Sequence, residues 1–141
     1  MEKGIREFQR LFTMELDNIM RDATTRVSNS LVRLSPVDEG DYVAEWDAAI
    51  NQWPRDTAQP PDPKKRTTRA RLKDVISGVS YGESVFFENT DPVGGRLEYG
   101  YSQQAPQGVV RLTTRKWRGF VRGAGKAAQS RVKKKIVTTN V

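Results

Sequence analysis

The chain has 141 residues, enough for one domain with a single hydrophobic core, which we place in residues 1–132, followed by a basic C-terminal tail at 133–141. It contains neither Cys nor His, which excludes disulfides, thiol chemistry, ordinary zinc sites and histidine-based acid–base catalysis. No apolar run approaches the roughly 18 residues of a membrane helix, and the charged N-terminus is unlike a signal peptide. We therefore expect a soluble protein made in a cytoplasm, without membrane contact.

The net charge of +7 is divided unevenly along the chain. Residues 1–98 hold 14 Lys and Arg and all 17 Asp and Glu, a net charge of −3. Residues 99–141 hold 10 Lys and Arg and no acidic residue, a net charge of +10. Such a change of sign indicates an acidic partner for the C-terminal part.

Residues 1–34 have the pattern of one long amphipathic helix. Apolar residues recur every three or four positions, which keeps one helix face apolar; they are Ile5, Phe8, Phe12, Leu16, Ile19, Ala23, Val27, Leu31 and Leu34. About 30 helical residues span roughly 45 Å, longer than a domain of this size requires. We expect the face to join the core and the excess length to pack on a neighbour. Pro36 ends the helix, because the residue before Pro is pushed out of helical geometry.

A turn and a half-buried strand are predicted next. Asp38 and Gly40 lie in the turn, since Asp favours turn starts and Gly supplies unusual backbone angles. From residue 42 to residue 50 every second residue faces one side, which predicts a strand with Trp46 as its anchor in the core. The carboxylates of this region lack the spacing of a calcium loop, so no metal site is predicted.

Residues 53–78 are predicted to form an exposed loop and a short helix. Four prolines keep residues 53–63 out of regular structure. Six basic residues follow within 64–73, where Thr67 or Thr68 is expected to cap a helix that ends near residue 78. This basic cluster either contacts phosphate groups or is a solvated helix face.

The next predicted elements are a second strand at 84–90 and a short helix from Pro92 to Tyr99. The segment 99–111 then joins two helices, and Gly100, Pro106 and Gly108 indicate a connection of fixed shape. Four of its side chains are candidate partner contacts, because Tyr and exposed amides suit interfaces: Tyr99, Tyr101, Gln103 and Gln104. The alternative is that Tyr99 belongs to the core and the Gln side chains cap the loop.

The final helix is expected to begin at a cap formed by Thr113 or Thr114. Trp117 and apolar residues spaced up to Val132 mark its buried face. The opposite face is basic and supplies further candidate partner contacts: Arg115, Arg118 and Arg122. Residues 133–141 are either a loose basic tail or a strand that becomes ordered on a partner.

No arrangement of residues predicts catalysis. Residues 123–126 resemble a phosphate-binding loop only superficially, because Phe120 and Ala127 occupy positions that require Gly and Ser or Thr. No His exists to activate a Ser. Glu88 and Glu98 can form a carboxylate pair, but nothing in the sequence places them around a sugar-sized cleft. We predict that the chain is not an enzyme and uses no cofactor.

DNA binding is the main alternative function. The basic C-terminal part suits non-specific contact with phosphates through counterion release. The chain shows no helix-turn-helix spacing and no exposed platform of aromatic residues between basic ones. The sequence therefore favours a non-specific contact with DNA over sequence-specific recognition.

Two blocks of sequence resemble the tail-completion (neck) proteins of tailed phages, a group of head–tail morphogenesis proteins that includes the minor tail protein Z of lambda-like phages. Ser35-Pro36-Val37-Asp38-Glu39-Gly40, followed by Trp46, is similar to their S-P-V-D-T-G … S-W signature. Residues 97–111, Leu-Glu-Tyr-Gly-Tyr-Ser-Gln-Gln-Ala-Pro-Gln-Gly-Val-Val-Arg, resemble their L-E-Y-G-x-S-x-Q-A-P-x-G-M-V-R block. In the first block Glu39 replaces a small hydroxyl residue, and residues 42–45 depart from the usual L-R-x-S run.

The resemblance implies an α+β fold with a long N-terminal helix and a C-terminal helix packed on a small antiparallel sheet. It also implies a homo-oligomeric ring, usually of six subunits, in the virion at the head–tail junction. Its partners there are the tail tube or tail terminator protein and the head connector or stopper proteins, and double-stranded DNA passes through the lumen. The basic side is expected to face a neighbouring subunit, the DNA in the lumen or an acidic adjacent ring.

Overall fold

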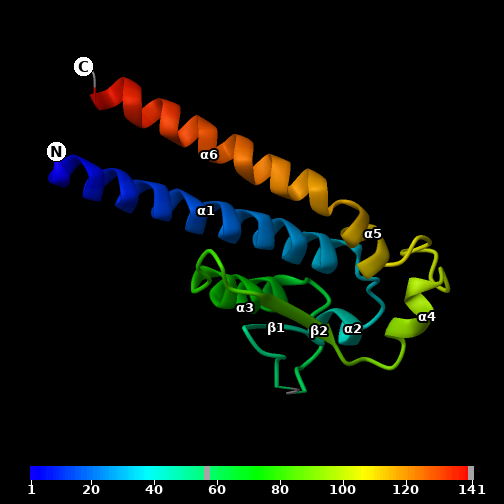
Figure 1. Ribbon diagram of the computed structural model, residues 1–141. Coiled ribbons are helices and arrows are strands. Elements are labelled where there is room, and N and C mark those ends of the chain that lie inside the picture. The colour runs from blue at the N-terminus through cyan, green and yellow to red at the C-terminus, as the bar shows by residue number, and fades with distance from the viewer. Residues whose placement is uncertain (56–57, 140–141) are drawn as a thin grey trace.

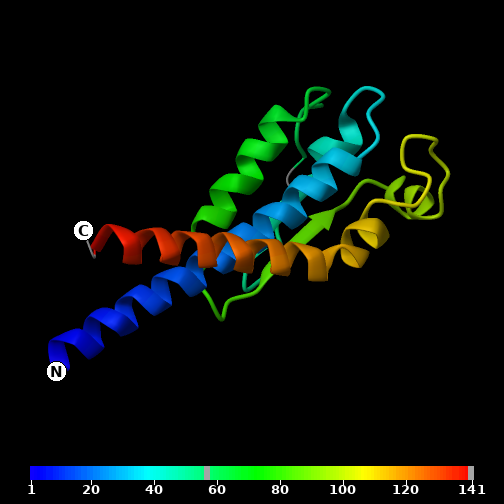
Figure 2. The ribbon, with the colours of Figure 1, turned by 90° about the horizontal axis from the view of Figure 1, so that it is seen from above.

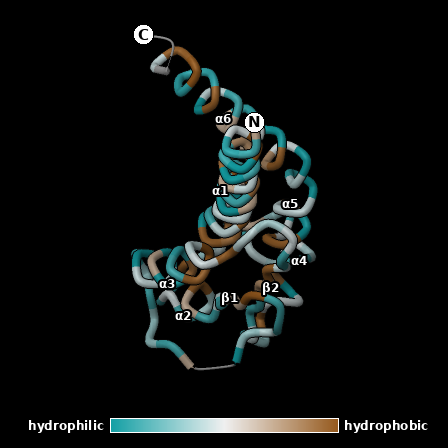
Figure 3. The backbone as a smooth tube through the Cα atoms, turned by 60° about the vertical axis from the view of Figure 1, so that its left-hand side comes forward, coloured by the Kyte–Doolittle hydropathy of each residue, from teal (hydrophilic) through white to brown (hydrophobic). Residues whose placement is uncertain are grey.

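The computed structural model describes residues 1–55 and 58–139, and it confirms the predicted α+β class. A long N-terminal helix, α1 (Glu2–Leu34), lies between the C-terminal helix α6 (Trp117–Thr139) and a lower layer (Figure 1). The lower layer holds helix α3 (Arg66–Ser77) and a two-stranded sheet (Figure 3). The predicted helix over residues 1–34 is therefore confirmed.

Helices α1 and α6 run in opposite directions and cross at an angle, so that the N- and C-terminal ends diverge at the same end of the molecule (Figure 2). Ala124 and Ala128 of α6 are buried at their contact, because small side chains allow the two helices to approach closely. At the other end of α1, the hydroxyl groups of Ser30 and Thr113 form a buried hydrogen bond of 2.8 Å. This bond ties α1 to the short helix α5 (Val110–Arg115).

The sheet consists of β1 (Trp46–Ile50) and β2 (Val85–Asn89), paired antiparallel with Trp46 opposite Asn89 and Ile50 opposite Val85. The predicted second strand is confirmed. The first is shorter than predicted, because residues 41–44 form the helical turn α2 (Asp41–Ala44). Tyr42, Val43 and Ala44 are buried in succession, which a half-buried strand does not allow.

The core lies where α1, α2, α3 and the sheet meet, and its members come from all parts of the chain. Leu72 of α3 and Val32 of α1 are fully buried, and the Trp46 ring packs edge-on against Tyr42 with 6.2 Å between ring centroids. Residues 1–12 of α1 lie outside this core and are exposed. The part of α1 that projects beyond the core is thus the excess length expected from the sequence.

Neither predicted threonine cap is correct. Helix α3 begins one turn earlier, and the carboxylate of Asp62 accepts hydrogen bonds from the backbone N–H of Arg66 and Thr68. The C-terminal helical region begins at Val110, so Thr113 is buried inside α5 rather than at a helix start. The cap of α3 comes from a carboxylate outside the helix, which a search for local Ser or Thr caps does not find.

Two further predictions for the C-terminal region are wrong. Trp117 is 45% exposed, because α5 ends at Arg115 and the chain starts a new helix at Trp117 with Ala124 and Ala128 on its buried face. Residues 133–139, expected to be a tail or a strand, continue α6 as helix, and residues 140–141 lie outside the described residues. The short helix predicted from Pro92 is α4 (Gly94–Glu98).

Candidate interaction surfaces

The first sequence block is a scaffold built around Ser35 and Trp46. The Trp46 indole Nε1 donates a hydrogen bond of 2.9 Å to Ser35 Oγ, which itself donates to the carbonyl of Leu31 at the end of α1. Both side chains are buried. The Ser-Pro pair and the Trp ten residues further on therefore hold the end of α1 against the start of β1.

The turn after Pro36 is held from outside by residues of the 58–65 loop. Lys65 Nζ donates to the carbonyls of Arg33 and Ser35, which satisfies acceptors that the end of α1 leaves open. Burial lowers the pKa of Lys65, and the charges of Arg69 and Arg33 lower it further. The carbonyl of Gly40 accepts the backbone N–H of Asp62. Asp38 is exposed and Pro36 is half-buried in this turn.

The two sequence blocks meet at the side chain of Gln104. Its carbonyl oxygen accepts the backbone N–H of Val37 at 2.9 Å, and its amide nitrogen donates to the Val37 carbonyl at 3.1 Å. Gln104 thus pairs with Val37 as a neighbouring strand would, across 67 positions of sequence. The side chain of Gln104 therefore links the two blocks. This agrees with the alternative that the Gln side chains cap the loop rather than contact a partner.

The carboxylate of Glu98 organises the second block. Its Oε1 accepts the backbone N–H groups of Val109 and Val110, at 2.9 and 2.7 Å, and its Oε2 accepts that of Arg111 at 3.0 Å. These N–H groups belong to the start of α5, where a negative charge is also favoured by the helix dipole. Glu98 therefore closes the base of the 99–108 loop. Both of its carboxylate oxygens accept backbone N–H groups, so the structure gives no support to the Glu88–Glu98 carboxylate pair considered from the sequence.

Gly100 and Gly108 are required by the geometry of this closed loop. Both have positive φ angles, +80° and +82°, which side chains with a Cβ rarely adopt. A Cβ on Gly100 would come within 2.7 Å of the Pro106 carbonyl oxygen, and one on Gly108 within 2.6 Å of Glu98 Oε2. The loop has a fixed shape because its backbone is closed at both contacts.

The closed loop presents two exposed tyrosines. Tyr99 is 85% exposed and Tyr101 is 75% exposed, so the alternative that Tyr99 is a core residue is wrong. Each ring lies under a guanidinium group: Arg111 is 5.5 Å from the Tyr99 centroid and Arg96 is 5.7 Å from the Tyr101 centroid. Such cation–π contacts restrain the rings while leaving them accessible. Gln103 and Pro106 are exposed on the same loop.

The predicted basic contacts lie on the surface of α5 and α6. Arg115, Arg118 and Arg122 are all exposed. They belong to a different element from the tyrosine loop, and no hydrogen bond that the structure gives joins the two groups among the described residues. The structure therefore offers two separate sets of candidate contacts rather than one site.

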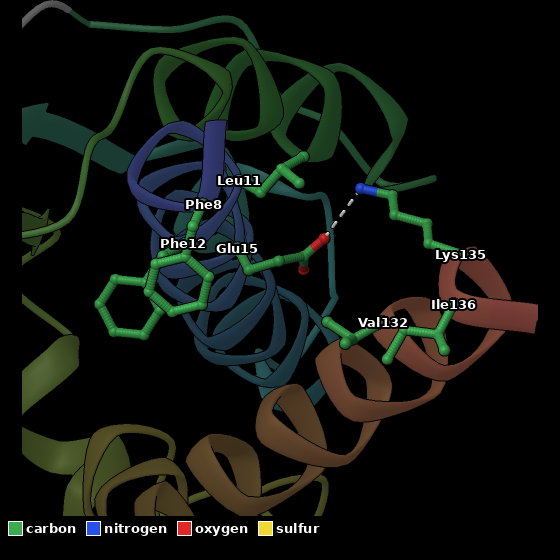
Figure 4. Close-up of a pocket in the computed structure, with 7 residues that line it drawn as sticks. All are labelled: Phe8, Leu11, Phe12, Glu15, Val132, Lys135 and Ile136. Carbon is green, nitrogen blue, oxygen red and sulfur yellow. Dashed lines mark hydrogen bonds and ion pairs between the residues drawn. The ribbon is translucent and has the colours of Figure 1, made fainter. Parts of the chain in front are cut away.

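A third surface, which the sequence predicted only as excess helix length, lies between the diverging ends of α1 and α6. We call it the helix-tip cleft. It has a volume of about 460 Å³, and Figure 4 shows apolar side chains of both helices around it. Its lining residues are Phe8, Leu11, Phe12, Glu15, Val132, Lys135 and Ile136. Phe8 and Phe12 stack with 6.1 Å between centroids, and Phe8 is 68% exposed.

One ion-pair cluster closes the inner end of this cleft. Glu15 accepts a hydrogen bond from Lys135 Nζ at 3.4 Å (Figure 4) and another from Arg131 Nε at 3.1 Å. These bonds join α1 to α6. Burial alone would raise the pKa of Glu15, but the hydrogen bonds and charges of Arg131 and Lys135 outweigh it and hold the pKa below its usual value. The cleft is thus apolar with its one carboxylate neutralised.

No group of three or more potential ligands among residues 1–55 and 58–139 is arranged to hold a metal ion. Within the same ranges, no helix combines the length and the apolar character that a membrane span requires. The comparisons with known proteins found no matching family model, curated protein or solved structure. The contacts described above are therefore the basis for any functional proposal, together with the motif resemblance.

Sequence reasoning missed three features of these surfaces. Glu98 gave no signal as a cap because it lies eleven positions before the first N–H that it accepts. The sequence also gave no indication that Arg96 and Arg111 contact the tyrosine rings, because these cation–π pairs form only when the loop closes. The exposure of Phe8 was not visible either, since helical periodicity identifies an apolar face but not what covers it.

Proposed function

We propose that this protein is a structural component of the head–tail junction of a tailed phage. In this role it forms a homo-oligomeric ring that completes the head-proximal end of the tail and joins it to the head connector. The ring contacts the tail tube or tail terminator on one side and the connector or stopper proteins on the other, with double-stranded DNA in its lumen. The protein is not an enzyme in this proposal and needs no cofactor or metal.

The observation that carries the proposal is the link between the two blocks that resemble this family. Gln104 of the second block binds both backbone groups of Val37 in the first, so the two blocks form one structural unit. That unit displays Tyr99 and Tyr101 on a loop of fixed shape. Restrained, exposed tyrosines suit an assembly contact, because a rigid aromatic group loses little entropy on binding.

The test is genetic complementation of a deletion of this gene in the phage or prophage that encodes it. The Tyr99→Ala, Tyr101→Ala double variant is expected to keep a wild-type melting temperature, because both rings are exposed. Infectious particles should fall at least tenfold, with unjoined heads and tails visible by negative-stain electron microscopy. Lys73→Ala, which removes an exposed side chain of α3 outside both the loop and the sheet, is the control and should complement fully. Full complementation by the double variant would sink the proposed role of the loop.

Non-specific DNA binding is the second candidate function. It is favoured by three exposed arginines on α5 and α6, which we call the arginine row: Arg115, Arg118 and Arg122. The Arg118→Glu, Arg122→Glu variant separates the two roles of this row. Failure to assemble necks would assign the row to a protein contact, whereas normal necks with poor DNA retention would assign it to the lumen. Tight, salt-resistant DNA binding by the isolated subunit in gel shifts would favour the free DNA-binding protein instead.

A further inference from the structure

The helix-tip cleft is an unpartnered apolar surface with a basic border. Ile5, Phe8 and Phe12 of α1 are each more than half exposed, although they continue the stripe that is buried further along the same helix. Ile136 of α6 is also more than half exposed. Contiguous exposed apolar groups of this kind usually mark an interaction site. The α6 side carries Lys133, Lys134 and Lys135, and α6 as a whole has seven basic residues and no acidic one.

The outer face of the sheet also carries apolar groups, but its charged neighbours are mainly acidic. Val85 and Phe87 of β2 pack against the core, so strand alternation turns Phe86 and Glu88 outward. Phe86 packs against Trp53, which is 63% exposed, with 4.8 Å between ring centroids. Asp47 lies directly opposite Glu88 in the register of the two strands.

Acidic groups dominate the segments that form this face. Residues 41–54 and 79–95 contain six carboxylates and no Lys or Arg. Two basic side chains from elsewhere, Arg55 and Arg71, border the depression beside Glu45, Asp47 and Glu88. Arg71 is engaged there with the carbonyls of Ala44 and Trp46. The sheet face is therefore an aromatic pair with an acidic border, the counterpart of the apolar cleft with a basic border.

We infer that the helix-tip cleft of one subunit docks on the Trp53–Phe86 face of a second copy of this chain. Contact between two helix tips would bring the basic ends of two α6 helices together and is disfavoured by repulsion. Contact between tip and sheet face joins apolar to apolar and basic to acidic groups. Because the two faces differ, this contact is heterologous, and repetition closes a ring or extends a filament. The inference rests on the proposed function only for the expectation that the ring closes.

The test mixes two variants of the full chain, each with one face damaged. The tip variant is Phe8→Asp, Ile136→Asp, and the sheet variant is Trp53→Ala, Glu88→Lys. Phe8, Ile136 and Trp53 are exposed, and Glu88 is half-buried beside a surface depression, so both variants are expected to fold. By sedimentation velocity over a concentration series, each variant alone should self-associate at least about tenfold more weakly than wild type. An equimolar mixture should form heterodimers and stop there, because it contains one intact tip and one intact sheet face. Val121→Asp, which changes an exposed apolar residue of α6 outside the cleft, is the matched control and should associate as wild type does.

Three results would overturn the inference. A sheet variant that associates as well as wild type indicates tip-to-tip contact, and a mixture that stays monomeric excludes the tip-to-sheet pair. A wild-type chain that stays monomeric throughout the series but binds phosphatidylserine vesicles through an intact tip assigns the cleft to a lipid surface. The proposed function fails separately, if wild-type protein associates tip-to-sheet but the gene is dispensable for joining heads to tails.

Discussion

The two halves of α1 have the same sequence pattern and opposite environments. From Ala23 to Leu34 the apolar stripe joins the hydrophobic core, where α1 packs against α3 and α5, and Leu31 and Val32 are buried. From Ile5 to Met14 the same stripe is exposed, and the diverging end of α6 lies beside it (Figure 2). The difference shows that one half of the helix builds the fold, whereas the other half is available to a partner.

The sharpest test of this comparison is a pair of truncations, one in each region. Leu72→Ala in the core should lower the free energy of unfolding by about 3 kcal/mol, because it removes a fully buried side chain and leaves a cavity. Phe8→Ala in the tip should change the free energy of unfolding of the monomer by no more than about 0.5 kcal/mol, since the ring is largely exposed. Urea unfolding at low protein concentration measures both values. A large loss for Phe8→Ala would show that the tip belongs to the folded core.

The second prediction concerns the base of the tyrosine loop. Glu98→Ala should cost about 2 kcal/mol of unfolding free energy, because three N–H groups at the start of α5 lose their charged acceptor. Glu98→Gln should cost about half as much, since its single carbonyl oxygen can still accept from Val109 and Val110. Thermal unfolding followed by circular dichroism compares the two variants.

Asp38→Ala is the control for Glu98→Ala, because it removes an exposed carboxylate from the neighbouring turn. It should leave the melting temperature close to that of wild type. If Glu98→Ala were equally harmless, the loop would be held by its glycine geometry and by Gln104 alone.

The elements that the sequence predicted well are those fixed by local periodicity. The helix over 1–34 follows from spacing alone, and the strand over 84–90 was predicted as a short run that Asp91-Pro92 ends. Trp46 is the core anchor that its place in an apolar alternation indicated. The helical turn α2 was missed because three buried residues in succession have no period. The caps from Asp62 and Glu98 were missed because each depends on how the chain folds back on a helix start.

The same limit applies to the candidate contacts. The composition of the 99–111 segment indicated exposed tyrosines, but which amide serves as a strut depends on the approach of Val37. Arg115, Arg118 and Arg122 are exposed as predicted, whereas Arg131 turns toward α1 and pairs with Glu15. The apolar tip was counted with the core stripe. Periodicity defines a face, and only the packing of distant elements decides whether it is covered.

The smallest expected effect is the pH dependence of the contact that joins the two helix tips. The pKa of Glu15 is lower in the folded chain than its usual value, so its ion pairs with Arg131 and Lys135 stabilise the fold above the unfolded pKa. That contribution is lost as the pH falls through the folded pKa.

Glu15→Gln should therefore lower the unfolding free energy at neutral pH by about 0.5–1 kcal/mol, a modest value because solvent screens the half-exposed Lys135. The difference from wild type should shrink steadily below about pH 4.3, the usual range of a Glu carboxyl. Glu7→Gln, which breaks a fully solvated pair with Arg10 on the same helix, is the control and should show a smaller change. A wild-type minus Glu15→Gln difference that stays constant from neutral to acid pH would mean that Glu15 acts by packing rather than by charge.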